Sequence, residues 1–363
     1  NLSALMDDTD KVHQFHEDAI ANGLAVLPPD INASEYRFVP VDANSIRYGL
    51  GAIKGTGESA IKAILKVRAE GGPFRDLFEF CLRVDQRIVN RRVLESLIRA
   101  GAFDSIDDHR HSLLATAGIA IEGAEQANRS AAQNSLFGSD SEIGGAHVTL
   151  VQRPRWSEKE RLVEEKQALG FYLSGHPFTS YLHEVAPLVR MRLSAVTPQT
   201  HNVTVAGVVN ALRVTQSRRG RMAIVQLDDG TARIEVTMYN ELFETSRALL
   251  KEDQLLVVEG RPQHDDFTGG IRLSAEKVYD LPAARDKFAR GIKLFCNGQS
   301  SGTKLREMLA AHRNGPCPVS IIYTNRDAEC RIDLGEEWRV KLNDTLLQTL
   351  GDWLQPENVQ IQY

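Results

Sequence analysis

The sequence of 363 residues lacks the features of membrane and secreted proteins. It has no apolar run of 18 residues and no charged-then-apolar leader, which indicates a cytoplasmic protein without a membrane partner. Cysteine is scarce and contains no CxxC pair, so neither a zinc ribbon nor a disulfide framework is indicated. We expect buried free thiols at the four positions, Cys81, Cys296, Cys317 and Cys330.

The sequence also lacks motifs of small-molecule catalysis, such as the lysine of a Walker A loop. The stretch "FDSIDDHRH" is acidic and histidine-rich, but carboxylates in such a loop are more typical of helix caps than of metal ligands. Two further acidic groups, at 228–229 and 264–266, precede glycines and are typical of turns between strands. The sequence therefore predicts no catalytic residue, no metal site and no cofactor.

Positive charge is scarce overall but locally concentrated. The formal net charge is -5, which argues against a uniformly basic nucleic-acid coat. Residues 45–101 nevertheless hold eleven Lys and Arg against six Asp and Glu, and residues 213–221 hold four arginines and no acid. These two segments are candidates for phosphate contact.

Periodicity divides the chain into segments of different kinds. A helix over 10–22 is closed by Gly23, and spacings of 3 and 4 predict helices through residues 45–118. An Ala-, Ser-, Gln- and Asn-rich stretch over 122–149 is typical of a flexible linker, and a helix with a capping box, Ser157 and Glu160, follows it. Because the chain opens with Asn1 inside a helical pattern, we expect a piece of a longer protein.

Beyond Val203 the period changes to 2. Three strand-like runs, a short helix and two more runs follow one another, which is the order of a five-stranded OB barrel. The last 75 or so residues mix strands and helices again, with "WRVKL" expected as a strand and the alternating "VQIQY" as a closing one. The fold class predicted is a multidomain α+β protein with a helical domain, an OB-fold β-barrel and a small C-terminal α+β domain.

The stretch "GLGAIKGTGESAIKAI" at 49–64 predicts a helix-hairpin-helix. Gly55 and Gly57 would make the hairpin, so that the N–H groups of Gly55, Thr56 and Gly57 approach a phosphate of duplex DNA at a helix N-terminus. Lys54 and Lys62 would add charge that reads no base sequence.

Two alternatives compete for the same glycines. A dinucleotide fingerprint needs a buried strand before the first glycine and an acidic residue after a second strand, and neither is present. An ordinary glycine turn between two helices stays open as the second alternative.

The polar stretch also contains "QNSLF", at Gln133, Ser135, Leu136 and Phe137. An exposed Leu-Phe pair in a flexible segment has no core to join, so it either packs locally or anchors in the pocket of a partner.

The chain resembles the alpha subunit of bacterial DNA polymerase III, the replicative C-family polymerase, in its C-terminal half. The resemblance runs from end to end through "LPPDIN", "YGLGAIKGTGE", "NRRVLESLIRAGAFD", "LGFYLSGHPF", "LDDGTARIEV" and "DDFTGGIRL", in that order. It implies a DNA-directed DNA polymerase as the parent chain. The family's palm aspartates, which hold Mg²⁺, have no match in this sequence, so the chain alone should be inactive.

The resemblance also implies a role for each segment. The implied segments are the end of the fingers domain at 1–40, a helix-hairpin-helix domain for duplex DNA at 41–120, a linker with a sliding-clamp motif at 121–150, a helical connector at 151–200, an OB-fold domain near the single-stranded template at 201–285, and a domain that binds the tau subunit of the clamp loader at 286–363. The clamp motif falls on Gln133, Ser135, Leu136 and Phe137.

The barrel segment is poor in stacking aromatics and slightly acidic, so DNA contact is expected locally, through Arg218, Arg219 and Arg221 of its first hairpin. Two alternatives remain for the chain as a whole. A repair or ligase-type protein also joins a helix-hairpin-helix to an OB fold, and an error-prone paralogue of the polymerase resembles this chain but typically stops near the OB fold.

Overall fold

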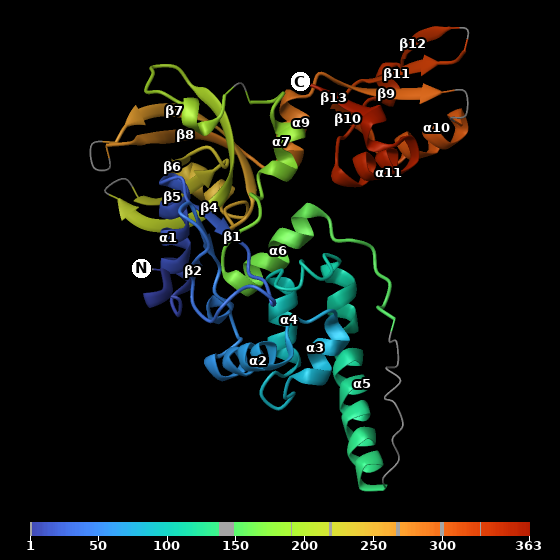
Figure 1. Ribbon diagram of the computed structural model, residues 1–363. Helices are drawn as coiled ribbons and strands as arrows, with labels where there is room; N and C mark the ends of the chain where they lie inside the picture. The colour runs from blue at the N-terminus through green and yellow to red at the C-terminus, as the bar shows by residue number, and fades with distance from the viewer. Residues whose placement is uncertain are drawn as a thin grey trace. The chain divides into compact units, whose positions relative to one another are not determined.

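The computed structural model describes residues 2–137, 149–189, 191–217, 220–265, 269–297, 301–326 and 328–363. The chain divides into two compact units, Asn1–His176 and Pro177–Tyr363. Each unit has its own buried apolar clusters, and each is described separately below (Figure 1).

The first unit is mainly helical. Its small sheet has the strand order β1-β3-β2, in which β1 and β3 are parallel. Its elements are η1 (Leu2–Ala4), α1 (Thr9–Ala21), β1 (Ala25–Leu27), β2 (Val39–Pro40), β3 (Ser45–Arg47), η2 (Leu50–Ala52), α2 (Glu58–Gly71), α3 (Leu77–Arg83), α4 (Arg91–Arg99), α5 (Arg110–Phe137) and α6 (Glu158–Leu169).

Helix boundaries in this unit follow local chemistry. Asp8, Asp76 and Asn90 cap α1, α3 and α4 by accepting backbone N–H bonds. The capping box predicted for Ser157 and Glu160 is present at the start of α6.

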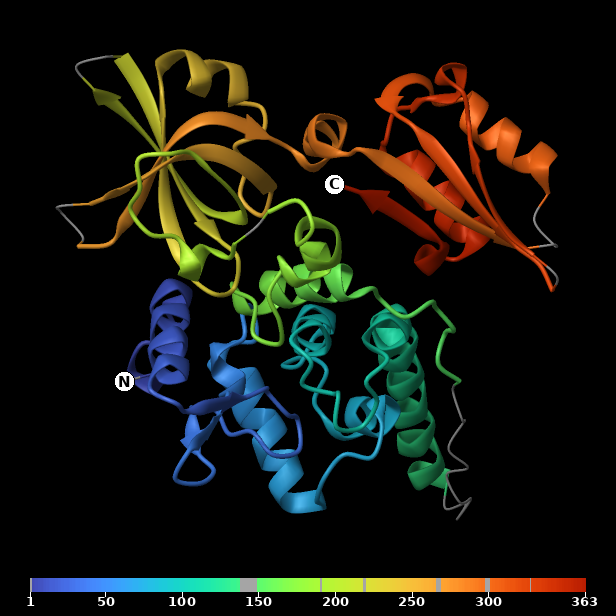
Figure 2. The same cartoon turned by 90° about the horizontal axis from the view of Figure 1, so that it is seen from above.

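Helix α5 contradicts the prediction of a linker that starts near residue 121. It is one helix of 28 residues through Phe137, and Figures 1 and 2 show its last turns extending past α3 and α4. Ala117, Ala120 and Ala124 are buried along its first half, and Arg129 pairs with Glu125 at 2.8 Å further on. The alanines that looked like low complexity are strong helix formers, so they continue the helix that packing of its first half stabilises.

The second unit begins with a helical connector and the barrel. Strands close in the order β4-β5-β6-β8-β7, in which β6 and β8 are parallel and the other pairs antiparallel. This pairing and the helix between the third and fourth strands are those of an OB fold, as predicted. The elements are α7 (Thr179–Val185), η3 (Leu193–Ala195), β4 (Val203–Ser217), β5 (Gly220–Asp228), β6 (Arg233–Tyr239), α8 (Asn240–Ser246), β7 (Leu255–His264) and β8 (Ile271–Tyr279).

A four-stranded sheet of order β12-β11-β9-β13 completes this unit, with α10 and α11 against one of its faces (Figure 1). Buried Arg285 of the preceding helix pairs with Glu184 of α7 and Asp344 of α11. The elements are α9 (Leu281–Phe288), β9 (Gly291–Asn297), α10 (Gly302–Ala310), β10 (Arg313–Cys317), β11 (Val319–Thr324), β12 (Glu329–Asp333), η4 (Glu336–Trp338), α11 (Asp344–Leu354), η5 (Pro356–Asn358) and β13 (Val359–Gln362).

The mixed α+β character of this region is confirmed, with one local error. "WRVKL" was expected as a strand, but its first residue ends the 3₁₀-helix η4 and only Val340 forms bridges, to Arg313 and Cys317. A single bridging residue makes no ladder. The closing strand at the chain's end is present and pairs with β9.

Candidate nucleic-acid interface

The glycine hairpin between η2 and α2 has the backbone that the sequence predicts. Gly55 has φ +80° and Gly57 has φ +70°, in the region where residues with a Cβ are strained. Helix α2 then begins at Glu58, with Gly57 as its N-cap and no side chain bonded to its first turn. The two glycines thus turn the chain sharply into a helix N-terminus.

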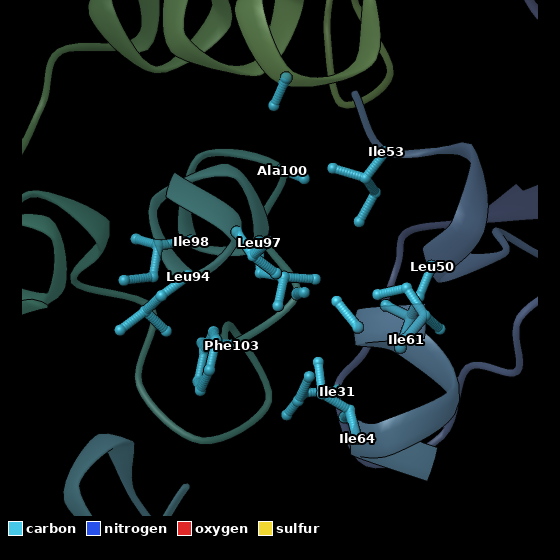
Figure 3. Close-up of a cluster of buried hydrophobic side chains, with 14 of the residues drawn as sticks. Ile31, Leu50, Ile53, Ile61, Ile64, Leu94, Leu97, Ile98, Ala100 and Phe103 are labelled. Carbon is cyan, nitrogen blue, oxygen red and sulfur yellow. The ribbon is translucent and has the colours of Figure 1, made fainter. Parts of the chain in front are cut away.

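A buried apolar cluster fixes this hairpin from beneath. Ile61 and Ile64 of α2 have 0% exposed surface, as does Leu97 of α4. Figure 3 shows Ile61 and Ile64 of α2 across from Leu97 of α4, with Leu50 beside Ile61. The exposed loop therefore rests on a core that leaves its backbone little freedom.

Thr56 holds the turn from inside. Its side chain is 2% exposed, and its hydroxyl donates to the carbonyl oxygens of Ile53 at 2.8 Å and Leu50 at 3.3 Å. Its backbone N–H also bonds to Ile53 O, at 3.4 Å. Thr56 therefore stabilises the loop, and its N–H is not free in the way that the sequence analysis assumed.

The N–H groups of Gly55 and Gly57 are different. Both residues are exposed, and within the described part of the chain neither N–H donates to another group. The first N–H groups of α2 also lack partners within the helix, as at every helix start. Backbone donors without a protein partner at the positive end of a helix dipole are suited to an anion such as a phosphate.

The two lysines predicted beside the loop differ in their surroundings. Lys54 is exposed, and its backbone N–H bonds to the carbonyl of Ala168 at 2.8 Å. Lys62 pairs with Glu58 across one helical turn at 2.7 Å. The hydrogen bond from Lys62 lowers the pKa of Glu58 and raises its own, so both groups are charged at neutral pH.

The structure adds Arg92, which the sequence analysis missed. Its Nε lies 3.6 Å from the point that a Cβ on Gly55 would occupy. Arg92 is exposed, and among the described residues no carboxylate lies within ion-pair distance of it. The signal was the pair Arg91–Arg92 at the start of α4, but only the fold brings α4 to the hairpin.

Of the three arginines predicted to contact DNA in the barrel, the structure describes Arg221. Arg218 and Arg219 lie outside the described residues. Arg221 is exposed at the start of β5, where its guanidinium lies 3.8 Å from Glu244 and 5.8 Å from the centre of the Phe243 ring. Helix α8 therefore places the carboxylate of Glu244 near Arg221, whose segment, residues 213–221, contains no acidic residue of its own.

The predicted partner motif of Gln133, Ser135, Leu136 and Phe137 lies in the last turns of α5. Its side chains are outside what the structure describes. The helical backbone corrects the expectation of a flexible linker at these positions.

The remaining candidates are structural. Asp104 pairs with Arg110, Asp107 accepts the N–H of His109, and Asp108 pairs with Arg155. In the described ranges no group of three His, Cys, Asp or Glu could hold a metal ion. Likewise, no described helix combines the length and apolar character needed to cross a bilayer.

Asp228 and Asp229 act in a turn, as predicted. The Asp229 carboxylate accepts the N–H groups of Thr231 and Leu193 and pairs with Arg192 at 2.7 Å. Burial raises the pKa of Asp229, but the hydrogen bonds from Thr231, Leu193 and Arg192 outweigh it and hold that pKa below its usual value.

Three family models match the chain. A helix-hairpin-helix motif covers residues 23–113, an OB-fold nucleic acid binding domain covers 203–281, and the C-terminal domain of DNA polymerase III subunit alpha covers 304–354. Together with the geometry above, they define a protein that joins a helix-hairpin-helix to an OB fold of the nucleic acid binding type.

Relatives specify the family. The chain is 41% identical to DNA polymerase III subunit alpha of Vibrio cholerae, 40% to that of Neisseria meningitidis serogroup A and 38% to that of Escherichia coli K12. Each match covers 100% of this chain and 32% of the relative. The chain belongs to the family of bacterial DNA polymerase III alpha subunits and spans about a third of the length of these relatives, which confirms the resemblance seen in the sequence.

Solved structures match about a quarter of the chain. The second OB-fold domain of replication protein A from Methanococcus maripaludis is 20% identical over 25% of this chain and 95% of that one, with a TM-score of 0.21. An OBody bound to hen egg-white lysozyme is 22% identical over 26% of this chain and 88% of that one, with a TM-score of 0.22.

Proposed function

We propose that the hairpin of residues 53–58 binds the backbone of duplex DNA during replication. The observation that carries this proposal is the pair of exposed N–H groups of Gly55 and Gly57 at the start of α2, on a turn that buried residues hold in place. Exposed Lys54 and Arg92 add positive charge beside the loop, whereas the charge of Lys62 is balanced by Glu58. Such contacts position a protein on DNA and read no base sequence.

The test is duplex binding by the double variant Gly55→Val and Gly57→Val. Side chains at these positive-φ positions strain the turn and obstruct the approach of a phosphate, so affinity should fall to a similar extent for duplexes of unrelated sequence. Gly72→Val is the control, because Gly72 also has φ +77° but lies away from the hairpin with open space around it. An equal loss in both variants, or a loss for some sequences only, would contradict the proposal.

The segment Gln133–Phe137 is proposed to dock on the β sliding clamp. Support comes from the motif itself and from its place at the end of α5, beyond the last described buried residue of that helix, Ala124. As anchors, Leu136 and Phe137 would each bury a large side chain in the clamp, at about 1.5–3 kcal/mol apiece.

Changing Leu136 and Phe137 to Ala should lower clamp affinity by roughly two to four orders of magnitude, measured by calorimetry. The matched control is Ile119→Ala, which removes an exposed apolar side chain from the same helix. An unchanged affinity would remove the proposed anchor. A much lower melting temperature would mean that the pair packs into a core.

The C-terminal domain is proposed to bind the tau subunit of the clamp loader. Support comes from the match of residues 304–354 to the C-terminal domain of the alpha subunit. Because Leu281 and Ala284 of α9 pack on the barrel, the chain should be cut after Arg290 rather than before α9. This truncation should abolish tau association in a pull-down and preserve DNA and clamp binding. Retained tau would place the docking surface elsewhere.

We further propose that the chain acts as part of a DNA-directed DNA polymerase. The relatives named above are DNA polymerase III alpha subunits, but this sequence holds no match to the palm aspartates that would bind Mg²⁺. Primer extension with Mg²⁺ should therefore give no product with this chain alone. Template-dependent extension by the purified chain would show that catalytic carboxylates lie within it.

A further inference from the structure

The end of helix α6 lies against the DNA-binding hairpin, although it is far away in sequence and outside the matched helix-hairpin-helix region. The helix terminates at Gly170, which has φ +90° and donates its N–H to Lys166 O at 2.7 Å. The carbonyl of Ala168, the residue before the last of α6, accepts the backbone N–H of Lys54 at 2.8 Å. The hairpin and the α6 terminus are thus joined through the backbone next to Gly55.

Gly170 leaves room for the side chain of Lys54. A Cβ built on Gly170 would lie 2.7 Å from Lys54 Nζ and 2.9 Å from Lys54 Cε, and it would overlap the Cγ2 methyl of Thr9. The ammonium of Lys54 therefore occupies the space that a side chain at position 170 would need.

Two anchors keep the end of α6 in place. Buried Glu165 accepts the backbone N–H groups of Leu173 and Ser174 and the hydroxyl of Ser174, the latter two at 2.7 Å. On the outer side of the helix, Glu164 pairs with Arg99 of α4 at 2.6 Å. Since α4 also packs under the hairpin, Gly170 and the hairpin are fixed to the same helix.

We propose that Gly170 is a positioning residue for DNA binding: by lacking a side chain it lets the Lys54 ammonium lie beside the phosphate-binding hairpin. This inference rests on the proposed binding of duplex DNA at Gly55 and Gly57. It adds a residue about 115 positions away that acts through Lys54 without touching DNA. A Cβ at position 170 displaces the far end of the Lys54 side chain, which is flexible and moves more easily than the backbone.

The test is Gly170→Ala in the full chain, combined with Thr9→Ser so that the overlap with the Thr9 methyl is removed. Duplex affinity should fall by roughly three- to tenfold near 0.1 M salt, and the salt slope should fall by up to about one contact. Gly23→Ala is the matched control, because Gly23 has φ +78° in the same unit with nothing within 4 Å of a Cβ. It carries the backbone strain without the displacement of Lys54.

A double-mutant cycle with Lys54→Ala separates this role from a structural one. If Gly170 acts through Lys54, the alanine at 170 should cause no further loss of affinity or salt slope in the Lys54→Ala background. Additive losses, or equal effects of the changes at Gly170 and Gly23, would overturn the inference while leaving DNA binding at the hairpin intact. If the valine variants at Gly55 and Gly57 bind duplex normally, the proposed function itself fails.

Discussion

Two hairpins of this chain are predicted to touch DNA, and they are built differently. The helical hairpin at 53–58 is short, has two positive-φ glycines and lies over fully buried Ile61 and Ile64. The barrel hairpin joins the long strands β4 and β5, and Leu212 and Val214 on it are exposed. The first presents backbone N–H groups above a buried core, whereas the second presents the exposed side chain of Arg221.

Under the proposed DNA binding, the helical hairpin depends more on the core beneath it than on its net charge, because its donors are backbone groups. A backbone donor gains from a rigid support because it cannot adjust its position as an arginine side chain can. Changes in the helical hairpin should therefore affect stability and DNA affinity together, while changes in the barrel hairpin should affect affinity alone.

The largest effect is expected when the support of the helical hairpin is removed. Ile61→Ala should lower the free energy of unfolding of the helical unit by about 2–5 kcal/mol, because its side chain is fully buried and leaves a cavity. Hydrogen exchange of the α2 amides measures the loss locally. Ile119→Ala, an exposed isoleucine on α5, is the control and should cost far less. Similar losses in both would mean that the hairpin does not depend on this core.

The barrel has a rigid turn of its own, at Asp229. Asp229→Asn should lower barrel stability at neutral pH by about 1–3 kcal/mol, because the charge that accepts from Thr231, Leu193 and Arg192 is lost. The folded state lowers the pKa of Asp229, so its contribution is complete above the unfolded pKa of about 4 and is lost as pH falls through the folded value.

The pH dependence supplies the check on Asp229. Thermal unfolding of the parent chain and the Asp229→Asn variant should differ at pH 7 and converge as the pH falls below about 4. A constant difference across this range would show that the charge of Asp229 contributes nothing to the stability of the turn.

The helical hairpin could be predicted because two closely spaced glycines are typical of a turn with positive φ. The barrel could be predicted because apolar and polar residues alternate along five segments. The sequence did not predict the roles of Thr56 and Gly170, since each depends on an atom that only the fold brings near. Arg92 and Glu244 were not predicted for the same reason, because each is distant in sequence from the hairpin that it approaches in the fold. Helix α5 was missed for another reason: its alanines suit both a helix and a polar linker, and packing of its first half decides between them.

A smaller effect is expected at the hydroxyl inside the helical hairpin. Thr56→Val keeps the shape but removes the hydroxyl donor from the carbonyls of Leu50 and Ile53, which keep backbone N–H partners, so it should cost about 0.5–1.5 kcal/mol. Duplex affinity should fall with it, because Gly55 and Gly57 lose their fixed geometry. Thr56→Ser keeps the hydroxyl and should restore most of both properties. Normal duplex binding by a destabilised Thr56→Val chain would show that the proposed DNA binding does not require a rigid turn.

The smallest effect is expected in the barrel hairpin, where an exposed ion pair competes with DNA. Glu244 lies 3.8 Å from the Arg221 guanidinium, and both side chains are about half exposed, so the pair contributes only about 0–1 kcal/mol to stability. Glu244→Gln should leave the melting temperature nearly unchanged and raise the affinity for a single-stranded oligonucleotide roughly two- to threefold, with a slightly steeper salt dependence as Arg221 becomes free for a phosphate. Glu241→Gln removes the same charge from the same helix, α8, and controls for the change in net charge. If both variants gain equally, the barrel responds only to total charge. If Glu244→Gln gains more, Arg221 is a specific contact, and the barrel hairpin depends on its side chains just as the helical hairpin depends on its backbone.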